Sequence, residues 1–429
     1  MQNISKIGFG AYRISIKSEE HKQALIHALN SGCNLIDTSS NYCDGESEEL
    51  IGQVLAENSQ FNPIIITKAG YIQGKNLAII DELNSNGKAE EDLVEISENL
   101  KHSIHPDFLE DQINRSLYRL QKESIDVFLL HNPEYYFKVD GSTHEQYYER
   151  IEKAFKFLEE KIEQGKIKSY GISSNTFPKQ LNAPDVTNLE KVYEIAQTIK
   201  KDHNFKFIQF PLNLIENYAM NEIYGKKNLI EKAKEYNLTT LINRPLNAFT
   251  DDGLVRLANY KNLIPFVEIE KARDHFHYCL KLVEDKYLEQ LSINDPEKEK
   301  KERQNFYNTP IVKQVSEIWE TLPSPDAVEQ VFYAHLFPFI AQVWGENGVP
   351  PEESTPFYKL VVLAMNLSRQ QMSLKADITK KILIEEKILE DSDKELSILA
   401  IEKYLEWGAD HILLGMKNEK YVDQVDEFL

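Results

Sequence analysis

Short apolar runs alternate with amphipathic stretches of helical period along the first 250 residues. Seven runs are predicted as strands, because they are short, apolar and rich in β-branched and aromatic residues, as buried parallel strands tend to be. These strands are Ile7–Tyr12, Asn34–Thr38, Pro63–Lys68, Asp126–His131, Ile167–Ser173, Phe207–Phe210 and Thr239–Asn243. Apolar residues that recur every three or four positions predict intervening helices over residues 19–30, 46–57, 107–121, 144–164, 188–200 and 227–236.

The alternation stops after residue 250 and resumes near residue 394. In between, the pattern predicts helices over residues 265–291, 309–321, 326–344 and 356–390, with charge-rich breaks such as Asp295–Lys301. A helix over residues 394–407, an eighth strand at His411–Gly415 and a last helix over residues 419–429 follow.

This order predicts an α/β fold: one (β/α)8 TIM barrel made of residues 1–250 and 391–429, with a mostly helical insertion at residues 251–390. A doubly wound open sheet is the alternative. Its dinucleotide-binding form expects the spacing G-x-G-x-x-G after the first strand, and Gly8-Phe9-Gly10 lacks the third glycine.

Two connections exceed ordinary length: residues 70–105 and the insertion at residues 251–390. Both follow strands, and in a (β/α)8 barrel such connections emerge at the catalytic face. We expect the insertion to lie over or beside that face and to select the substrate. The alternative is a helical appendage that binds a protein partner or a second copy.

Composition narrows the range of partners. The formal net charge of -20 disfavours nucleic acid and anionic membranes. The three cysteines have no metal-ligand spacing, and His275 and Cys279, four apart on a predicted helix, lack a second ligand pair, so no metal site is predicted. Without a signal peptide or a membrane-spanning apolar run, the expected location is the cytoplasm.

Polar residues stand where the predicted strands end, which is where a barrel gathers its catalytic groups. The clearest case is residues 37–42, which hold an acid and a phenol on one loop directly after the second strand. The strand-end residues are Asp37, Lys68, His131, Ser174 with Asn175, Gln209 and Arg244.

Four segments together resemble the aldo-keto reductase superfamily. They are residues 36–42 (Ile-Asp-Thr-Ser-Ser-Asn-Tyr, followed by Glu48 and Gly52), 66–68 (Ile-Thr-Lys), 129–133 (Leu-Leu-His-Asn-Pro) and 171–175 (Gly-Ile-Ser-Ser-Asn). The resemblance covers residues 4–250 and 394–429. It implies a (β/α)8 barrel that reduces an aldehyde or ketone with a nicotinamide cofactor, or oxidises an alcohol in reverse.

The resemblance implies a catalytic tetrad of Asp37, Tyr42, Lys68 and His131. Hydride delivered to a carbonyl leaves an oxyanion that needs a proton, and Tyr42 is the expected donor. An unperturbed tyrosine pKa is ~10, and a neighbouring ammonium lowers it by favouring the phenolate. Lys68 is thus expected to tune Tyr42, Asp37 to pair with Lys68, and His131 to donate the hydrogen bond that orients the carbonyl oxygen.

The resemblance also implies the cofactor contacts. Asn175, Gln209 and one of the doubled serines, Ser173 or Ser174, would hold the nicotinamide carboxamide. Arg244, Pro245 and Leu246 after the seventh strand, and Gly415 and Lys417 after the eighth, are the remaining predicted contacts.

Two features of these segments bear on cofactor choice. Lys417 and Lys420 favour NADP(H), with NAD(H) as the alternative. An aromatic residue that stacks on the nicotinamide is common in the family at the seventh strand, but Asn243 stands there, and Phe249 is the nearest candidate to replace it.

Two competing functions remain open from the sequence. One is a catalytically degenerate protein whose helical insertion binds a partner. The other keeps the same site for a non-redox reaction.

Overall fold

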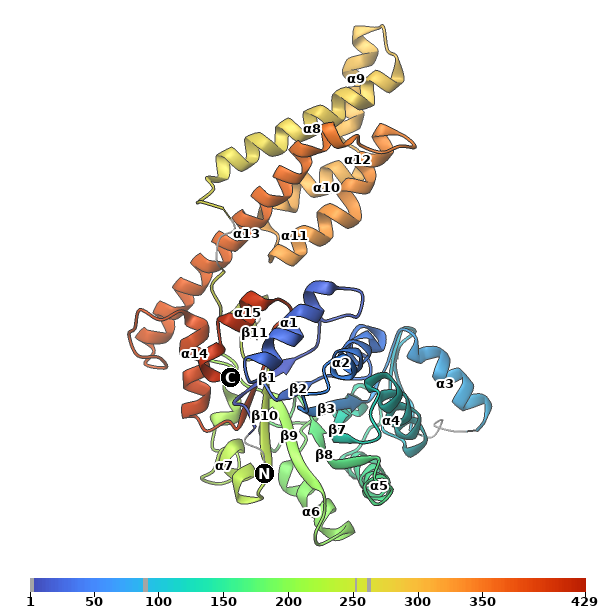
Figure 1. Ribbon diagram of the computed structural model, residues 1–429, viewed down its shortest axis with the longest axis vertical. Coiled ribbons are helices and arrows are strands. Elements are labelled where there is room, and N and C mark those ends of the chain that lie inside the picture. Colours follow the sequence, from blue (N-terminus) through green and yellow to red (C-terminus); the bar gives the residue numbers. More distant parts are fainter. Residues whose placement is uncertain (1–3, 88–91, 251–252, 261–263) are drawn as a thin grey trace. The chain divides into compact units, whose positions relative to one another are not determined.

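The computed structural model describes residues 4–87, 92–250, 253–260 and 264–429 (Figure 1). The chain forms two compact units. One comprises Met1–Val255 with Ile398–Leu429, and the other comprises Arg256–Ser397. No helix of the described residues is long and apolar enough to cross a bilayer.

The first unit is a closed barrel, with every strand parallel to its neighbours, in the order β1-β13-β10-β9-β8-β7-β3-β2. The strands are β1 (Ile7–Gly10), β2 (Leu35–Asp37), β3 (Ile64–Ala69), β7 (Ile125–His131), β8 (Ile167–Ser173), β9 (Phe205–Pro211), β10 (Thr239–Asn243) and β13 (His411–Gly415). Phe9 pairs with both Ile36 and Leu414, which closes the ring. The predicted (β/α)8 barrel is confirmed, and the open sheet is wrong.

Helices surround the strands (Figure 1). They are α1 (Glu19–Asn30), α2 (Glu46–Glu57), α4 (Pro106–Leu120), α5 (His144–Glu163), α6 (Leu189–Ile199), α7 (Leu229–Glu235), α14 (Leu396–Glu406) and α15 (Glu419–Asp423). The helices that carry an apolar stripe bury it. In α4, for example, Phe108 and Ile113 are buried. A tight cluster of apolar side chains, including Leu35, Ile66 and Leu129, fills part of the barrel core.

The strands approach one another closely at Gly171 in β8. A Cβ there would come within 2.0 Å of the Phe207 carbonyl oxygen of β9, so only glycine allows this spacing. The end of β8 is thereby held close to β9, and both strands bring polar side chains to the mouth.

The long connection after β3 is an ordered subdomain rather than a loop. It contains β4 (Tyr71–Ile72), α3 (Asn76–Ser85), β5 (Val94–Ser97) and β6 (Leu100–His102). The three strands form an antiparallel sheet in the order β4-β6-β5. Residues 88–91 lie outside the described part of the chain.

The second unit is helical, as predicted for most of residues 251–390. It contains α8 (Ile269–Leu291), α9 (Pro296–Tyr307), α10 (Pro310–Ile318), α11 (Pro325–Val331), α12 (Phe337–Trp344) and α13 (Pro351–Glu385). A short sheet of β11 (Asn247–Thr250) and β12 (Gly253–Arg256) precedes it in the chain.

The predicted break at Asp295–Lys301 is wrong, because these residues cap and begin α9. Asp295 accepts a hydrogen bond from the Glu297 amide, and Pro296 occupies the first turn. An ion pair between Glu299 and Arg303, four residues apart, supports the helix. Only Phe306 of α9 is buried, so the apolar periodicity that marks other helices is missing here.

A substitution in the core of the helical unit should destabilise this unit and not the barrel. Trp319 is 3% exposed and stacks on Phe276, with ring centroids 4.9 Å apart. We expect Trp319→Ala to lower the free energy of unfolding of this unit by about 3–5 kcal/mol. Hydrogen exchange should accelerate within residues 264–397 and not in the barrel.

Tyr333→Ala is the matched control, because this side chain is 52% exposed. Equal destabilisation by both substitutions would contradict the assigned core.

Candidate active site

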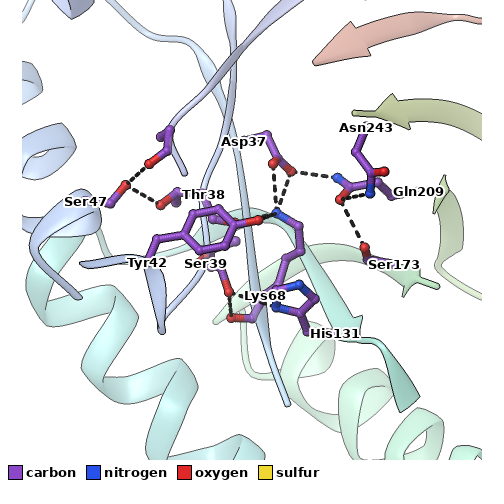
Figure 2. A network of polar contacts seen from close by, with 12 residues as sticks. Asp37, Thr38, Ser39, Tyr42, Ser47, Lys68, His131, Ser173, Gln209 and Asn243 are labelled. Atoms are coloured by element: carbon purple, nitrogen blue, oxygen red, sulfur yellow. Dashed lines mark hydrogen bonds and ion pairs between the residues drawn. The ribbon is translucent and has the colours of Figure 1, made fainter. Parts of the chain in front are cut away.

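A buried ion pair lies at the carboxyl ends of β2 and β3 (Figure 2). The Lys68 ammonium donates to both carboxylate oxygens of Asp37 at 2.8 Å and to the Thr38 carbonyl at 2.7 Å. The Lys68 side chain is fully buried. All three ammonium protons are thereby satisfied, as a charge without water requires.

Tyr42 lies against this pair on the loop after β2. Its hydroxyl oxygen is 3.4 Å from Lys68 Nζ, and the Tyr12 ring packs edge-on against it with centroids 5.0 Å apart. The chain then turns through Cys43 and Asp44, at φ of 49° and 55°, into α2. The predicted closeness of Asp37, Lys68 and Tyr42 is thus present in the structure.

The electrostatics of Tyr42 differ from the sequence expectation. Burial, and then the Asp37 carboxylate, raise the pKa of Tyr42 well above its usual value. The shift is opposite to the lowering expected from Lys68, whose Nζ lies 2.8 Å from Asp37 Oδ1 and 3.4 Å from the Tyr42 hydroxyl. Burial also lowers the pKa of Lys68, against the opposing effect of Asp37. The phenol therefore rests in its protonated form.

His131 ends β7 on the other side of Lys68. Its Nδ1 lies 3.1 Å from Ser39 Oγ, and its carbonyl oxygen accepts a 2.7 Å hydrogen bond from His102 Nε2. The Tyr71 ring packs edge-on against the imidazole with centroids 4.7 Å apart. Burial, and then the Lys68 charge, hold the pKa of His131 well below its usual value, so the ring is neutral.

An amide cluster adjoins the ion pair. Gln209 Nε2 donates to Asp37 Oδ1 at 2.7 Å, and Gln209 Oε1 accepts from Ser173 Oγ at 3.0 Å and from Asn243 Nδ2 at 3.3 Å. Asn243 Oδ1 is buried and has no hydrogen-bond partner among the described residues. One polar network therefore joins residues from β2, β3, β8, β9 and β10 (Figure 2).

Ser174, the other member of the serine pair, faces a different environment. Its hydroxyl lies 3.1 Å from Thr176 Oγ1 and 2.9 Å from Thr187 Oγ1. Of the pair, Ser173 donates to the Gln209 side chain, whereas the Ser174 backbone amide donates to the Gln209 carbonyl oxygen at 2.9 Å. Asn175 is exposed, and its backbone amide donates to buried Glu134 at 2.8 Å.

A cavity of about 500 Å³ lies beside the strand ends of β8, β9 and β10 and is lined in part by Asn175, Lys179, Glu216 and Arg244. The Arg244 guanidinium pairs with Glu216 at 3.3 Å and covers the Phe249 ring at 5.1 Å. Arg244 Nε is buried and finds no acceptor in the part of the chain that the structure describes. Phe249 is itself 56% exposed.

The remaining predicted contacts lie on loops after β10 and β13. The Pro245 carbonyl accepts from the Tyr404 hydroxyl at 2.7 Å, and Leu246 is partly buried. Gly415 pairs with Gly10 across the barrel closure. Lys417 precedes α15 and lies near enough to His21 to contribute, after burial, to lowering its pKa.

The sequence reasoning missed Ser39, Asn243 and Tyr71. Ser39 stands between Asp37 and Tyr42 in the loop already singled out, so that loop contained the signal. Asn243 ends its strand one residue before Arg244, and the alternation of side chains along a strand could have found it. Nothing local marks Tyr71, which reaches His131 from the subdomain after β3.

The pair His275 and Cys279 has a structural explanation. Both side chains lie within hydrogen-bond distance of the Pro356 carbonyl, at 2.9 Å for Nε2 and 3.4 Å for Sγ. Among the residues that the structure describes, no three His, Cys, Asp or Glu side chains gather at metal-binding distance.

Residues 6–247 match the sequence model of the Aldo/keto reductase family. This chain belongs to the aldo/keto reductase family. The resemblance deduced from the four motifs is confirmed.

Several individual proteins are similar to this family member. "Aldo-keto reductase yakc [NADP(+)]" from Schizosaccharomyces pombe is 29% identical over 176 residues, which cover 40% of this chain and 42% of that protein. Aldo-keto reductase YhdN from Bacillus subtilis is 22% identical over 244 residues, covering 56% and 57%. The chain thus spans about half the length of these curated relatives.

The structure of a glycerol dehydrogenase from Gluconobacter oxydans matches with a TM-score of 0.50 at 17% identity, over 99% of this chain and 86% of that one. At this identity the likeness concerns the fold alone.

Because Asp37 and Lys68 form a buried ion pair, we expect the effects of substituting them on the free energy of unfolding to be strongly non-additive. Lys68→Met leaves the Asp37 carboxylate buried without its cation, so we expect the free energy of unfolding to fall by about 3–5 kcal/mol. Asp37→Asn should destabilise for the converse reason. The double substitution should cost clearly less than the sum of the two. Urea denaturation of all four proteins measures this cycle, and additivity within about 0.5 kcal/mol would contradict it.

Proposed function

We propose that this aldo/keto reductase is an NADP(H)-dependent oxidoreductase that reduces an aldehyde or ketone to an alcohol, or catalyses the reverse oxidation. The observation that carries the proposal is the fully buried Lys68 ammonium, 2.8 Å from Asp37 and 3.4 Å from the Tyr42 hydroxyl. A phenol, a charge pair and a neutral imidazole around one point suit proton transfer to a carbonyl oxygen.

Tyr42 is the proposed proton donor. Its raised pKa keeps the phenol protonated until negative charge develops on the substrate oxygen. As the proton leaves, Lys68 stabilises the phenolate across 3.4 Å, and Asp37 holds Lys68 in place. His131 is the proposed group that orients the substrate at this point.

The residues at the mouth fit a nicotinamide cofactor, which supplies or accepts hydride when bound. The unpaired Asn243 Oδ1 suits a carboxamide N–H, and the unpaired Arg244 Nε suits an anionic oxygen. Ser173, Asn175 and Gln209 are the proposed carboxamide contacts. Ser174 is better assigned to the hydroxyl cluster that supports this loop.

The loops after β10 and β13 supply the other proposed cofactor contacts: Pro245, Leu246, Gly415, Lys417 and Lys420. The name of the Schizosaccharomyces pombe relative specifies NADP(+), which supports NADP(H) here. NAD(H) is the alternative cofactor.

A role for the helical unit is inferred from its position in the sequence, between β10 and β13. Its segment leaves the barrel after the carboxyl end of β10, where substrate-binding loops of such barrels arise. We assign it the choice of substrate, with binding of a partner protein as the alternative role.

Removing the Tyr42 hydroxyl should abolish most activity. General acid catalysis contributes about 10²–10⁴-fold, so Tyr42→Phe should lower kcat for carbonyl reduction by at least about a hundredfold. NADPH affinity, measured by fluorescence titration, should stay unchanged. Tyr118→Phe is the control because Tyr118 is 85% exposed. A kcat within about threefold of wild type for Tyr42→Phe would remove the proposed role.

Lys417 should discriminate between the two cofactors. A charge-assisted hydrogen bond contributes about 1.5–3 kcal/mol, so Lys417→Glu should raise KM for NADPH by at least about tenfold and leave KM for NADH nearly unchanged. Lys166→Glu, at the exposed loop before β8, matches the charge change as a control. Equal effects of Lys417→Glu on both cofactors would refute a contact with the 2′-phosphate.

A further inference from the structure

Glu134 is a carboxyl group buried beside the strand ends. It lies on the short 3-10 turn η2 (Pro133–Lys138) after β7 and is 6% exposed. Its Oε1 accepts a 2.8 Å hydrogen bond from the Asn175 backbone amide, whereas its Oε2 is buried and has no hydrogen-bond partner among the described residues. No lysine, arginine or histidine in the described part of the chain pairs with it. The group therefore lacks the cation that a buried carboxylate normally requires.

The backbone on either side of Asn175 is anchored by other groups. The Ser174 amide donates to the Gln209 carbonyl oxygen at 2.9 Å, and the Thr176 amide donates to Ser174 Oγ at 3.1 Å. Between them, the Asn175 amide donates to Glu134, and the Asn175 residue is exposed. The Glu134 carboxyl group is thus the contact that fixes the backbone of Asn175 itself.

This contact suits the ionised form of Glu134. A proton on Oε1 would face the Asn175 N–H, and a proton on Oε2 would be a buried donor without an acceptor among the described residues. A carboxylate instead accepts from the amide in a charge-assisted hydrogen bond, which is roughly twice as strong as a neutral one. Protonation therefore favours another arrangement of Glu134 and weakens its hold on Asn175.

Burial acts against ionisation. It raises the pKa of Glu134 to about 7, against the opposing hydrogen bonds from backbone amides. Arg150 of α5 does not compensate the charge, because it pairs with Asp92. The titratable groups that face Glu134 from neighbouring elements are Tyr147 of α5, Asp185 of the loop after β8 and Tyr71 of the subdomain after β3. These groups are neutral or negative near pH 7, so none of them stabilises the carboxylate.

We propose that Glu134 is a positioning residue for the nicotinamide cofactor, and that its ionised form holds Asn175 where this residue can bind the carboxamide. The inference rests on the proposed oxidoreductase function, in which Asn175 contacts the carboxamide. Cofactor affinity should be highest when Glu134 is ionised and should fall as the pH is lowered and Glu134 takes up a proton.

The pH dependence of cofactor binding tests this role without turnover. NADH is the probe, because a phosphate monoester such as the 2′-phosphate of NADPH itself titrates, with a pKa of about 6. In fluorescence titrations, we expect Kd for NADH to be at least about threefold higher near pH 6 than near pH 8. One proton with a pKa of about 7 limits this change to about tenfold. A smaller change than threefold would overturn the inference, whereas no binding of NADH or NADPH at any pH would refute the proposed function itself.

Glu134→Gln tests whether Glu134 is the titrating group. Glutamine has a similar size and keeps an acceptor, but it cannot ionise. Kd should become nearly independent of pH and should exceed the wild-type value near pH 8 by at least about threefold. Because both proteins bind the same cofactor, their difference also isolates Glu134 when NADPH is the probe. A wild-type pH profile in Glu134→Gln would remove the role assigned to Glu134.

Glu145→Gln is the matched control, because it removes the same charge at an exposed position in the first turn of α5. It should keep the wild-type profile, and loss of the pH dependence in this variant would contradict the assignment to Glu134.

Proton release on binding gives a second measurement that needs only the wild-type protein. If cofactor binding favours the ionised form of Glu134, NADH binding near pH 7 should release a fraction of a proton, at most about one half. Calorimetric titration in two buffers with different ionisation enthalpies measures this fraction. Binding without proton release would overturn the inference and leave the oxidoreductase proposal standing.

Discussion

One buried charge organises the mouth of this barrel. The Lys68 ammonium has no exposed surface, and an unpaired ammonium in such a place costs several kcal/mol or loses its proton. The Asp37 carboxylate and the Thr38 carbonyl supply all three acceptors, at 2.7–2.8 Å. Because the partners come from β2 and β3, the requirement to pair this charge also fixes the loop that carries Tyr42.

The Asp37 carboxylate also links the ion pair to side chains on other strands of the barrel. Gln209 of β9 donates to Asp37, and its own oxygen accepts from Ser173 of β8 and Asn243 of β10. Each group has a fixed number of protons and lone pairs, so satisfied networks of this kind favour one arrangement. The unpaired Asn243 Oδ1 is an exception within the network and marks where a ligand can complete it.

Desolvation determines how the site can react. Lys68 is paired with Asp37, and burial together with the Asp37 carboxylate raises the pKa of Tyr42, so the phenol stays protonated. The same burial keeps His131 neutral. In the proposed reduction, charge separation is delayed until the substrate oxygen becomes negative, when a preorganised ammonium is already in place. The subdomain after β3 contributes Tyr71, whose ring packs edge-on against His131.

The sequence by itself determined the barrel, the helical second unit and the candidate residues Asp37, Tyr42, Lys68, His131 and Gln209. Apolar periodicity and the polar residue that ends a buried run are local properties, so they can be read without coordinates. Three features were decided only by tertiary structure. The direction of the Tyr42 pKa depends on burial and on the distance between Asp37 and Lys68. The presence of Ser173 and Asn243 in the network depends on which face each strand end turns inward. The helix at residues 296–307 buries one apolar side chain, so its sequence has no periodic apolar pattern from which the helix could be predicted.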